Sequence, residues 1–133
     1  MARYLLDTNA CIRYLKNNSG VVERVRQAGV TELSICAPVR AELWYGACKS
    51  ENAERNRERV ARFCADLPCL PFDAVAADRC GEIRAEQARQ GIAIGPYDLQ
   101  IAAIALVHGL TLVSNNLDEF HRVHGLVVED WQS

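Results

Sequence analysis

The sequence has no long hydrophobic run and no leader-like start. Although half of its 133 residues are hydrophobic, no run approaches the roughly 18 uncharged residues of a membrane-spanning helix. Asp7 interrupts the short apolar run near the N-terminus, which argues against a secretory signal. We therefore expect a cytoplasmic protein with no membrane contact.

The cysteines lack the spacing of a zinc site or of a disulfide framework. No C-x-x-C pair occurs, and several cysteines fall inside apolar periodic segments. The six positions are Cys11, Cys36, Cys48, Cys64, Cys69 and Cys80. We interpret them as reduced thiols, mostly buried, and we do not expect a structural zinc ion.

Positive charge is scarce, and lysine is scarcer still. The net charge of −2 lacks the basic excess that is typical of nucleic-acid-binding proteins. Lys16 and Lys49 are the only lysines among 15 basic residues, so 13 are arginine. Arginine suits bidentate phosphate contacts. Any binding to nucleic acid must therefore come from local arginine patches.

The chain also lacks repeats, low-complexity tracts and linkers, and its elements alternate. The predicted strands cover 3–8, 32–37, 69–72, 110–114 and 125–130. The predicted helices cover 9–17, 20–29, 38–50, 52–67, 73–91 and a segment from Pro96. The strands show little polar alternation, which favours a parallel sheet covered on both faces. We predict one α/β domain, residues 1–133, with a polar turn at 115–120.

Asp98 is an acidic residue at the start of an otherwise apolar helix. In "IGPYDLQIAAIAL" (94–106), Gly95 and Pro96 mark the helix start, and every residue from Ile101 to Val107 is apolar. The helix is therefore predicted to be buried on most sides. Asp98 in its first turn complements the helix dipole, a benefit of about 0.3–1 kcal/mol. That benefit explains an acidic residue without requiring a function.

Further polar residues are predicted to converge with Asp98. Sites in open parallel sheets form outside the carboxyl ends of the strands. Asp7 follows the first strand, Glu42 lies just beyond the second, and "SNNLDE" (114–119) follows the strand at 110–114. Clustered carboxylates repel one another, and a divalent cation relieves that repulsion. Oxygen ligands suit Mg²⁺ or Mn²⁺, which predicts a metal-dependent nuclease.

Each signal has a simpler interpretation when it is taken alone. Asp7 can cap the following helix, and Glu42 can be a solvated residue or an ion-pair partner. Asn115 and Asn116 are also typical turn residues. The histidines of "HRVH" (121–124) have ligand-like i,i+3 spacing. Without acidic or cysteine neighbours, such a pair is more typical of the protein surface.

Four motifs in order closely resemble the PIN-domain ribonucleases, in particular VapC-type toxins. The motifs are "LLDTN" (5–9), "AELWYG" (41–46), "GPYDLQIAAIA" (95–105) and "TLVSNNLDEF" (111–120), and the resemblance extends to "VEDW" (128–131). It implies a PIN-like α/β/α sandwich with a central parallel sheet and an acidic Mg²⁺ site, with Mn²⁺ as an alternative. It also implies RNA cleavage, frequently in a tRNA anticodon stem-loop, which inhibits translation. The implied partners are a cognate VapB-type antitoxin and a second copy in a homodimer.

The resemblance assigns roles to three acidic positions. Asp7 matches the first acidic residue of the family, Glu42 the second and Asp98 the third, with Asp7 and Asp98 as metal ligands. Thr8 and Ser114 match positions that support the site through hydrogen bonds.

The fourth motif departs from the family pattern. Many members have an aspartate where this chain has Asn116. Either Asn116 coordinates through water, or Asp118 or Glu119 supplies the charge.

Two other classes compete with a nuclease. Phosphotransfer enzymes also carry an aspartate after the first strand, but the haloacid-dehalogenase type needs a second aspartate where this chain has Asn9. These enzymes also use a lysine near the phosphate, and Lys16 and Lys49 lie outside any suitable late strand. The second alternative is a non-catalytic PIN-like module that binds RNA or protein. Three retained carboxylates argue against it.

Overall fold

Five short strands form one parallel sheet. A computed structural model describes residues 2–132. The strands are β1 (Tyr4–Leu6), β2 (Leu33–Cys36), β3 (Cys69–Leu70), β4 (Thr111–Val113) and β5 (Val128–Glu129). Their order is β3-β2-β1-β4-β5, and each neighbouring pair is parallel. The predicted parallel sheet is confirmed.

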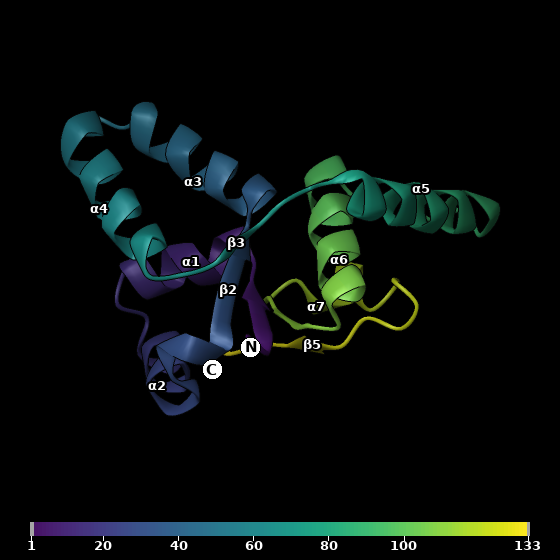
Figure 1. Cartoon of the computed structure of the whole chain (residues 1–133), viewed down its shortest axis with the longest axis horizontal. Helices are drawn as coiled ribbons and strands as arrows, with labels where there is room; N and C mark the ends of the chain where they lie inside the picture. The colour runs from purple at the N-terminus through teal and green to yellow at the C-terminus, as the bar shows by residue number, and fades with distance from the viewer. Residues whose placement is uncertain (1, 133) are drawn as a thin grey trace.

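Helices cover both faces of the sheet. They are α1 (Thr8–Leu15), α2 (Ser19–Ala28), α3 (Ala37–Cys48), α4 (Ala53–Ala65), α5 (Ala74–Arg89), α6 (Pro96–His108) and the single turn α7 (Leu117–Phe120), with a 3₁₀ turn η1 (Val30–Glu32) before β2. Figure 1 shows α1, α2 and α4 on one side of the sheet and α5 and α6 on the other. The fold is therefore the predicted α/β/α sandwich.

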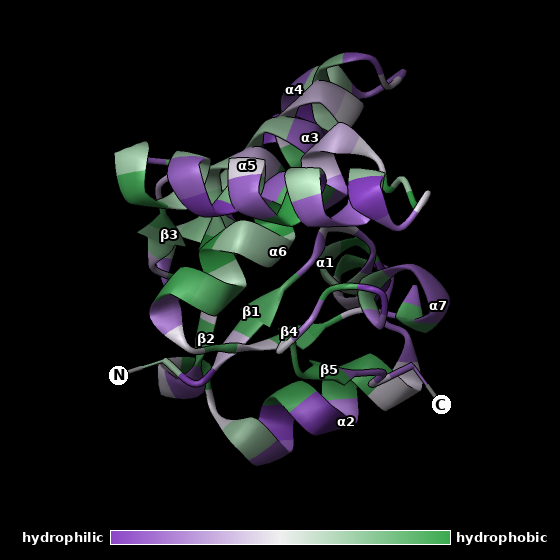
Figure 2. Ribbon diagram, turned by 90° about the vertical axis from the view of Figure 1, so that its right-hand side faces the viewer, coloured by the Kyte–Doolittle hydropathy of each residue, from purple (hydrophilic) through white to green (hydrophobic). Residues whose placement is uncertain are grey.

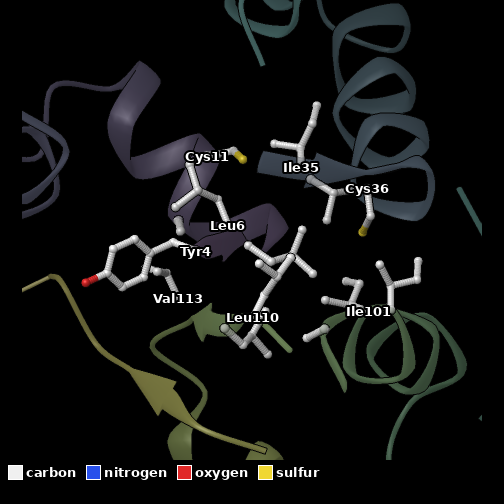
Figure 3. Packing of buried hydrophobic residues seen from close by; sticks show 14 of the residues in the cluster. Tyr4, Leu6, Cys11, Ile35, Cys36, Ile101, Leu110 and Val113 are labelled. Carbon is white, nitrogen blue, oxygen red and sulfur yellow. The ribbon is translucent and has the colours of Figure 1, made fainter. Parts of the chain in front are cut away.

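The core lies where α6 and α1 pack on the central strands. Every residue of β1 and β2 is buried, as continuous apolar strands between two helical layers require. In α6, residues 101–105 are all buried, which confirms the prediction from its apolar sequence. Figure 3 shows Leu6, Ile35 and Ile101 among the packed side chains. In Figure 2, hydrophobic residues fill β1 and β4, while many hydrophilic residues lie along α5. A rigid core therefore supports the carboxyl edge of the sheet.

The segment 115–120 differs from its prediction as a polar turn. Residues 117–120 form α7, in which the amide of Phe120 donates to the carbonyl of Asn116 at 3.2 Å. Phe120 is completely buried, so its apolar ring holds this turn against the core. The strands predicted at 69–72 and 125–130 are shorter than expected, because each finds only two paired residues on its neighbour.

The cysteines are less buried than expected. All six are free, but only Cys11, Cys36 and Cys64 are buried, whereas Cys48 and Cys69 are exposed. Burial raises the pKa of Cys36 to about 12, so this thiol stays protonated. No helix within residues 2–132 is both long enough and apolar enough to cross a membrane.

Candidate active site

Two adjacent strands place Asp7 beside Ser114. Leu6 of β1 pairs with Val113 of β4, and the amide of Asp7 donates to the carbonyl of Val113 at 3.0 Å. Asp7 and Ser114, each one residue beyond its strand, therefore emerge together at the carboxyl edge. Glu42 comes to this edge on the second turn of α3, and Asp98 on the first turn of α6.

Asp7 is a helix cap and a site residue at once. Its side chain is only 4% exposed, and its Oδ1 accepts a hydrogen bond of 2.8 Å from the amide of Ala10, which caps α1. Burial raises the pKa of Asp7 above its ordinary value, and the charge of Glu42 adds to that rise. Hydrogen bonds from Ser114 and Ala10 lower the pKa in part. The capping role that the sequence allowed is therefore present, and Asp7 also lies close enough to Glu42 to feel its charge.

Thr8 connects the start of α1 to Glu42. The Thr8 hydroxyl donates to Oε1 of Glu42 at 2.7 Å, across 34 residues of sequence. Both side chains are half-buried. A hydroxyl has a single proton to donate, and here that proton orients the carboxylate. Thr8 is therefore placed to support Glu42, which is the kind of supporting role expected for it.

The fourth motif is built around Asn116 and Glu119. The hydroxyl oxygen of Ser114 accepts a hydrogen bond of 3.0 Å from the Asn116 amide nitrogen of the main chain. The side-chain amide of Asn116 donates to Oε2 of Glu119, and Oε1 of Glu119 accepts from the amide of Gly95 at 3.0 Å. Asp118 is exposed and takes no part in these bonds. Of the two acidic candidates, the geometry brings Glu119 to the site and leaves Asp118 outside.

Asp98 experiences the charge of the whole cluster. Its pKa is raised from 3.8 to about 7, with partial burial as the largest cause and the carboxyl group of Glu119 as the next. Asp7 and Glu42 raise the pKa of Asp98 further. Four carboxyl groups from distant parts of the sequence are therefore close enough to repel one another. An excess of negative charge of this kind favours binding of a cation.

The donor set suits a hard divalent cation that keeps much of its water. Within residues 2–132, no three His, Cys, Asp or Glu side chains form a ready-made metal cage. Mg²⁺ does not need such a cage, since it is commonly bound through one or two carboxylates and several waters. The buried carboxylate of Asp7 and the raised pKa of Asp98 fit this arrangement. The chemistry of the residues therefore fits Mg²⁺ or Mn²⁺.

Sequence reasoning missed two groups at the site. The amide of Gly95 holds Glu119, and the charge of Arg13 lowers the pKa of Asp7. No sequence signal marks a backbone amide that acts across 24 residues, although Arg13 lies on the helix that Asp7 caps. His121 and His124 are exposed residues outside the acidic cluster, as expected for surface residues.

The parallel sheet gathers oxygen donors at its carboxyl edge, where open α/β sheets form their functional sites. A family model described as PIN domain matches residues 4–126. The chain belongs to the PIN-domain family.

Known proteins of this family match the chain over nearly its whole length. The tRNA(fMet)-specific endonuclease VapC of Shigella flexneri is 43% identical over 131 residues, which cover 98% of this chain and 99% of that protein. The protein of the same name from Salmonella typhimurium is 42% identical with the same coverage. A crystal structure of DNA-bound VapBC from Salmonella typhimurium contains a chain with a TM-score of 0.93 and 43% identity, covering 98% of this chain and 99% of that one. A chain in the crystal structure of VapBC2 from Rickettsia felis, bound to a DNA fragment from its promoter, has a TM-score of 0.89 and 34% identity. The match covers 96% of this chain and 98% of that one.

Proposed function

We propose that this chain is an Mg²⁺-dependent endoribonuclease toxin that cleaves structured RNA and so inhibits translation. The observation that carries the proposal is the convergence of four carboxyl groups, those of Asp7, Glu42, Asp98 and Glu119. The other three carboxyl groups each raise the pKa of Asp98, because they lie near it. The relatives named as tRNA(fMet)-specific endonucleases support a tRNA as the substrate. We place the cut in an anticodon stem-loop and the protein in the cytoplasm, where tRNA is found.

The site residues divide the work of hydrolysing a phosphodiester bond. Asp7 and Asp98 would hold the cation, with Mn²⁺ as an alternative to Mg²⁺. When bound, a divalent cation supplies an activated water and neutralises charge on the phosphodiester. Glu42, whose carboxylate accepts a hydrogen bond from Thr8, would accept a proton from the attacking water. Asn116 and Glu119 brace the start of α6, and with it Asp98.

We further propose that a cognate VapB-type antitoxin neutralises this activity. The solved relatives named VapBC are toxin–antitoxin assemblies, which supports such a partner. The acidic cluster would accept a cationic side chain of the antitoxin, because an opposite charge relieves the repulsion among the carboxylates. A homodimer stays a prediction from the family resemblance.

Controlled expression tests the toxin function in cells. Expression of the chain alone should halt growth and translation, and mapping of RNA 5′ ends should reveal new ends within a tRNA. Co-expression of the small protein encoded beside it should restore growth. Asp7→Asn keeps an acceptor for the α1 cap while removing the charge, so it should accumulate as folded protein without toxicity. Unimpaired growth with abundant folded wild-type protein would instead favour a non-catalytic binding module.

A further inference from the structure

A hollow of about 320 Å³ lies between α5 and the segment that follows α7. Arg79, Glu86 and Gln87 line it from α5, and His121, Arg122 and His124 line it from the other side. In Figure 2 the C-terminal end of α5 lies above α7. The hollow therefore brings together two segments that have no role in the acidic site.

Gln87 gives this hollow a buried polar group without a partner. Its side chain is 3% exposed, and its Nε2 has no hydrogen-bond acceptor among residues 2–132. The backbone carbonyl of Gln87 is satisfied, because it accepts from the amide of Ile92 at 2.8 Å after the chain reverses at Gly91, whose φ is +71°. Buried polar groups are nearly always paired, so the unpaired amide of a residue that lines the hollow is available to a hydrogen-bond acceptor there.

The opposite wall is held rigidly enough to present its side chains. Val123 is buried, and its amide donates to the carbonyl of Phe120 at 3.0 Å. The amides of His121 and Arg122 donate to carbonyls of α7 at 2.8 and 3.2 Å. His121, Arg122 and His124 are exposed on either side of this anchor. The backbone of the "HRVH" segment is therefore held in place, with the nitrogen-bearing side chains of His121, Arg122 and His124 at the surface.

The charges around the hollow favour an anion. Arg122 forms no ion pair within the described part of the chain, and Arg79 has only a half-exposed contact of 3.5 Å with Glu82. Glu86 is the single carboxylate against two guanidinium groups in the lining. Guanidinium and amide N–H groups together match phosphate oxygens.

Both walls of the hollow are linked to the acidic cluster through Glu119. The amide of Arg122 donates to the carbonyl of Glu119, whose carboxylate belongs to the acidic cluster. From Ile92 in the hollow, the chain runs to Gly95, whose amide binds the same carboxylate. We infer that the hollow binds a backbone phosphate of the RNA substrate, next to the nucleotide whose phosphodiester is cut. This inference rests on the proposed nuclease function.

Salt dependence of RNA binding tests the site. The probe is a labelled tRNA anticodon stem-loop, and the protein carries Asp7→Asn so that the probe is not cut. On this background Arg122→Ala should reduce the slope of log K against log salt by about 0.7, the share of one phosphate contact. Gln87→Met should weaken binding roughly 2- to 10-fold without changing the slope, because it removes a neutral hydrogen bond. Arg89→Ala, on an exposed residue of α5 that does not line the hollow, is the matched control and should leave the slope unchanged.

Thermal melting separates binding from a structural role. Gln87→Met should melt no lower than its parent, since the amide it removes has no partner in the fold. A lower melting temperature with unchanged RNA affinity would overturn the inference. The inference would also be overturned if Arg89→Ala changed the salt slope as much as Arg122→Ala does. It would be overturned as well if Arg122→Ala or Gln87→Met weakened antitoxin binding and left RNA binding intact.

Cleavage assays keep this inference distinct from the proposed function. With Asp7 restored, the Arg122→Ala and Gln87→Met proteins should show a raised KM and a nearly unchanged kcat. If the wild type cuts RNA and these variants match its KM, the phosphate site is wrong and the nuclease function stands. If the wild type neither binds nor cuts RNA, the proposed function fails, and this inference fails with it.

Discussion

Asp98 carries the strongest electrostatic signal at the residue scale. It lies in the first turn of α6, where the helix dipole favours a negative charge. Burial and the neighbouring carboxyl groups of Glu119, Asp7 and Glu42 oppose that benefit and raise the pKa of Asp98 to about 7. Burial and repulsion together therefore outweigh the favourable effect of the dipole on the charged form of Asp98. A position chosen for helix stability alone would show the opposite balance.

This balance predicts how stability depends on pH. Because the pKa of Asp98 is about 7 in the folded protein and near 3.8 without the fold, the folded state binds the proton more tightly. Without metal, the free energy of unfolding should therefore fall as pH rises from about 4 to about 7, and the loss should be complete above that range. Asp98→Asn should flatten this decline, as measured by urea unfolding in EDTA across the pH series. An identical decline in wild type and variant would assign the effect to other groups.

The fourth motif yields a matched pair of neighbouring variants. Glu119 receives hydrogen bonds from Asn116 and Gly95, whereas Asp118 is exposed and lies outside these bonds. Glu119→Gln should lower the cleavage rate by about 10- to 100-fold, as is typical for groups that support a metal ligand. Asp118→Asn changes the charge equally and should leave the rate nearly unchanged. The reverse ranking of the two rates would contradict this assignment.

At the scale of elements, one hydrogen bond couples α1 to α3. Thr8→Val keeps the shape of the side chain and removes the donor to Glu42. Thr8→Val should lower the free energy of unfolding by about 1 kcal/mol and slow cleavage. Thr8→Ser keeps the hydroxyl donor, so it should keep the wild-type stability and cleavage rate. A double-mutant cycle with Glu42→Gln should give a coupling of at least about 0.5 kcal/mol. Simple additivity in denaturation and in cleavage rate would show that the bond does not couple the helices.

The long elements could be predicted from sequence because their patterns are local. The apolar run of residues 101–107 predicts a buried helix, and residues 101–105 of α6 are completely or almost completely buried. The turn α7 could not be predicted, because four residues are too few for a helical period and the burial of Phe120 is a tertiary effect. Short elements depend on packing against distant partners.

At the scale of the whole molecule, the convergence of the acidic residues follows from parallel topology. Parallel strands bring their carboxyl ends to one edge, so Asp7, Glu42 and Asp98 could be grouped from sequence before their contacts were known. The choice of Glu119 over Asp118 depends on the backbone amide of Gly95, which no residue pattern encodes. The unpaired amide of Gln87 was equally hidden, since a glutamine within α5 looks like a solvated residue.

The central claim is that these carboxylates form one metal-dependent site that cuts RNA, and cleavage of a purified tRNA pool tests it most directly. The proteins compared are wild type, Asp7→Asn, Asp98→Asn and the double variant, each in excess Mg²⁺ and in EDTA. The wild type should cut in Mg²⁺ and not in EDTA, and each single variant should lose at least about 100-fold, beyond the loss typical of supporting groups. The double variant should cleave no more slowly than the slower of the two single variants, because both residues serve one site. Cleavage that survives EDTA, or that is unaffected by all three variants, would contradict the account.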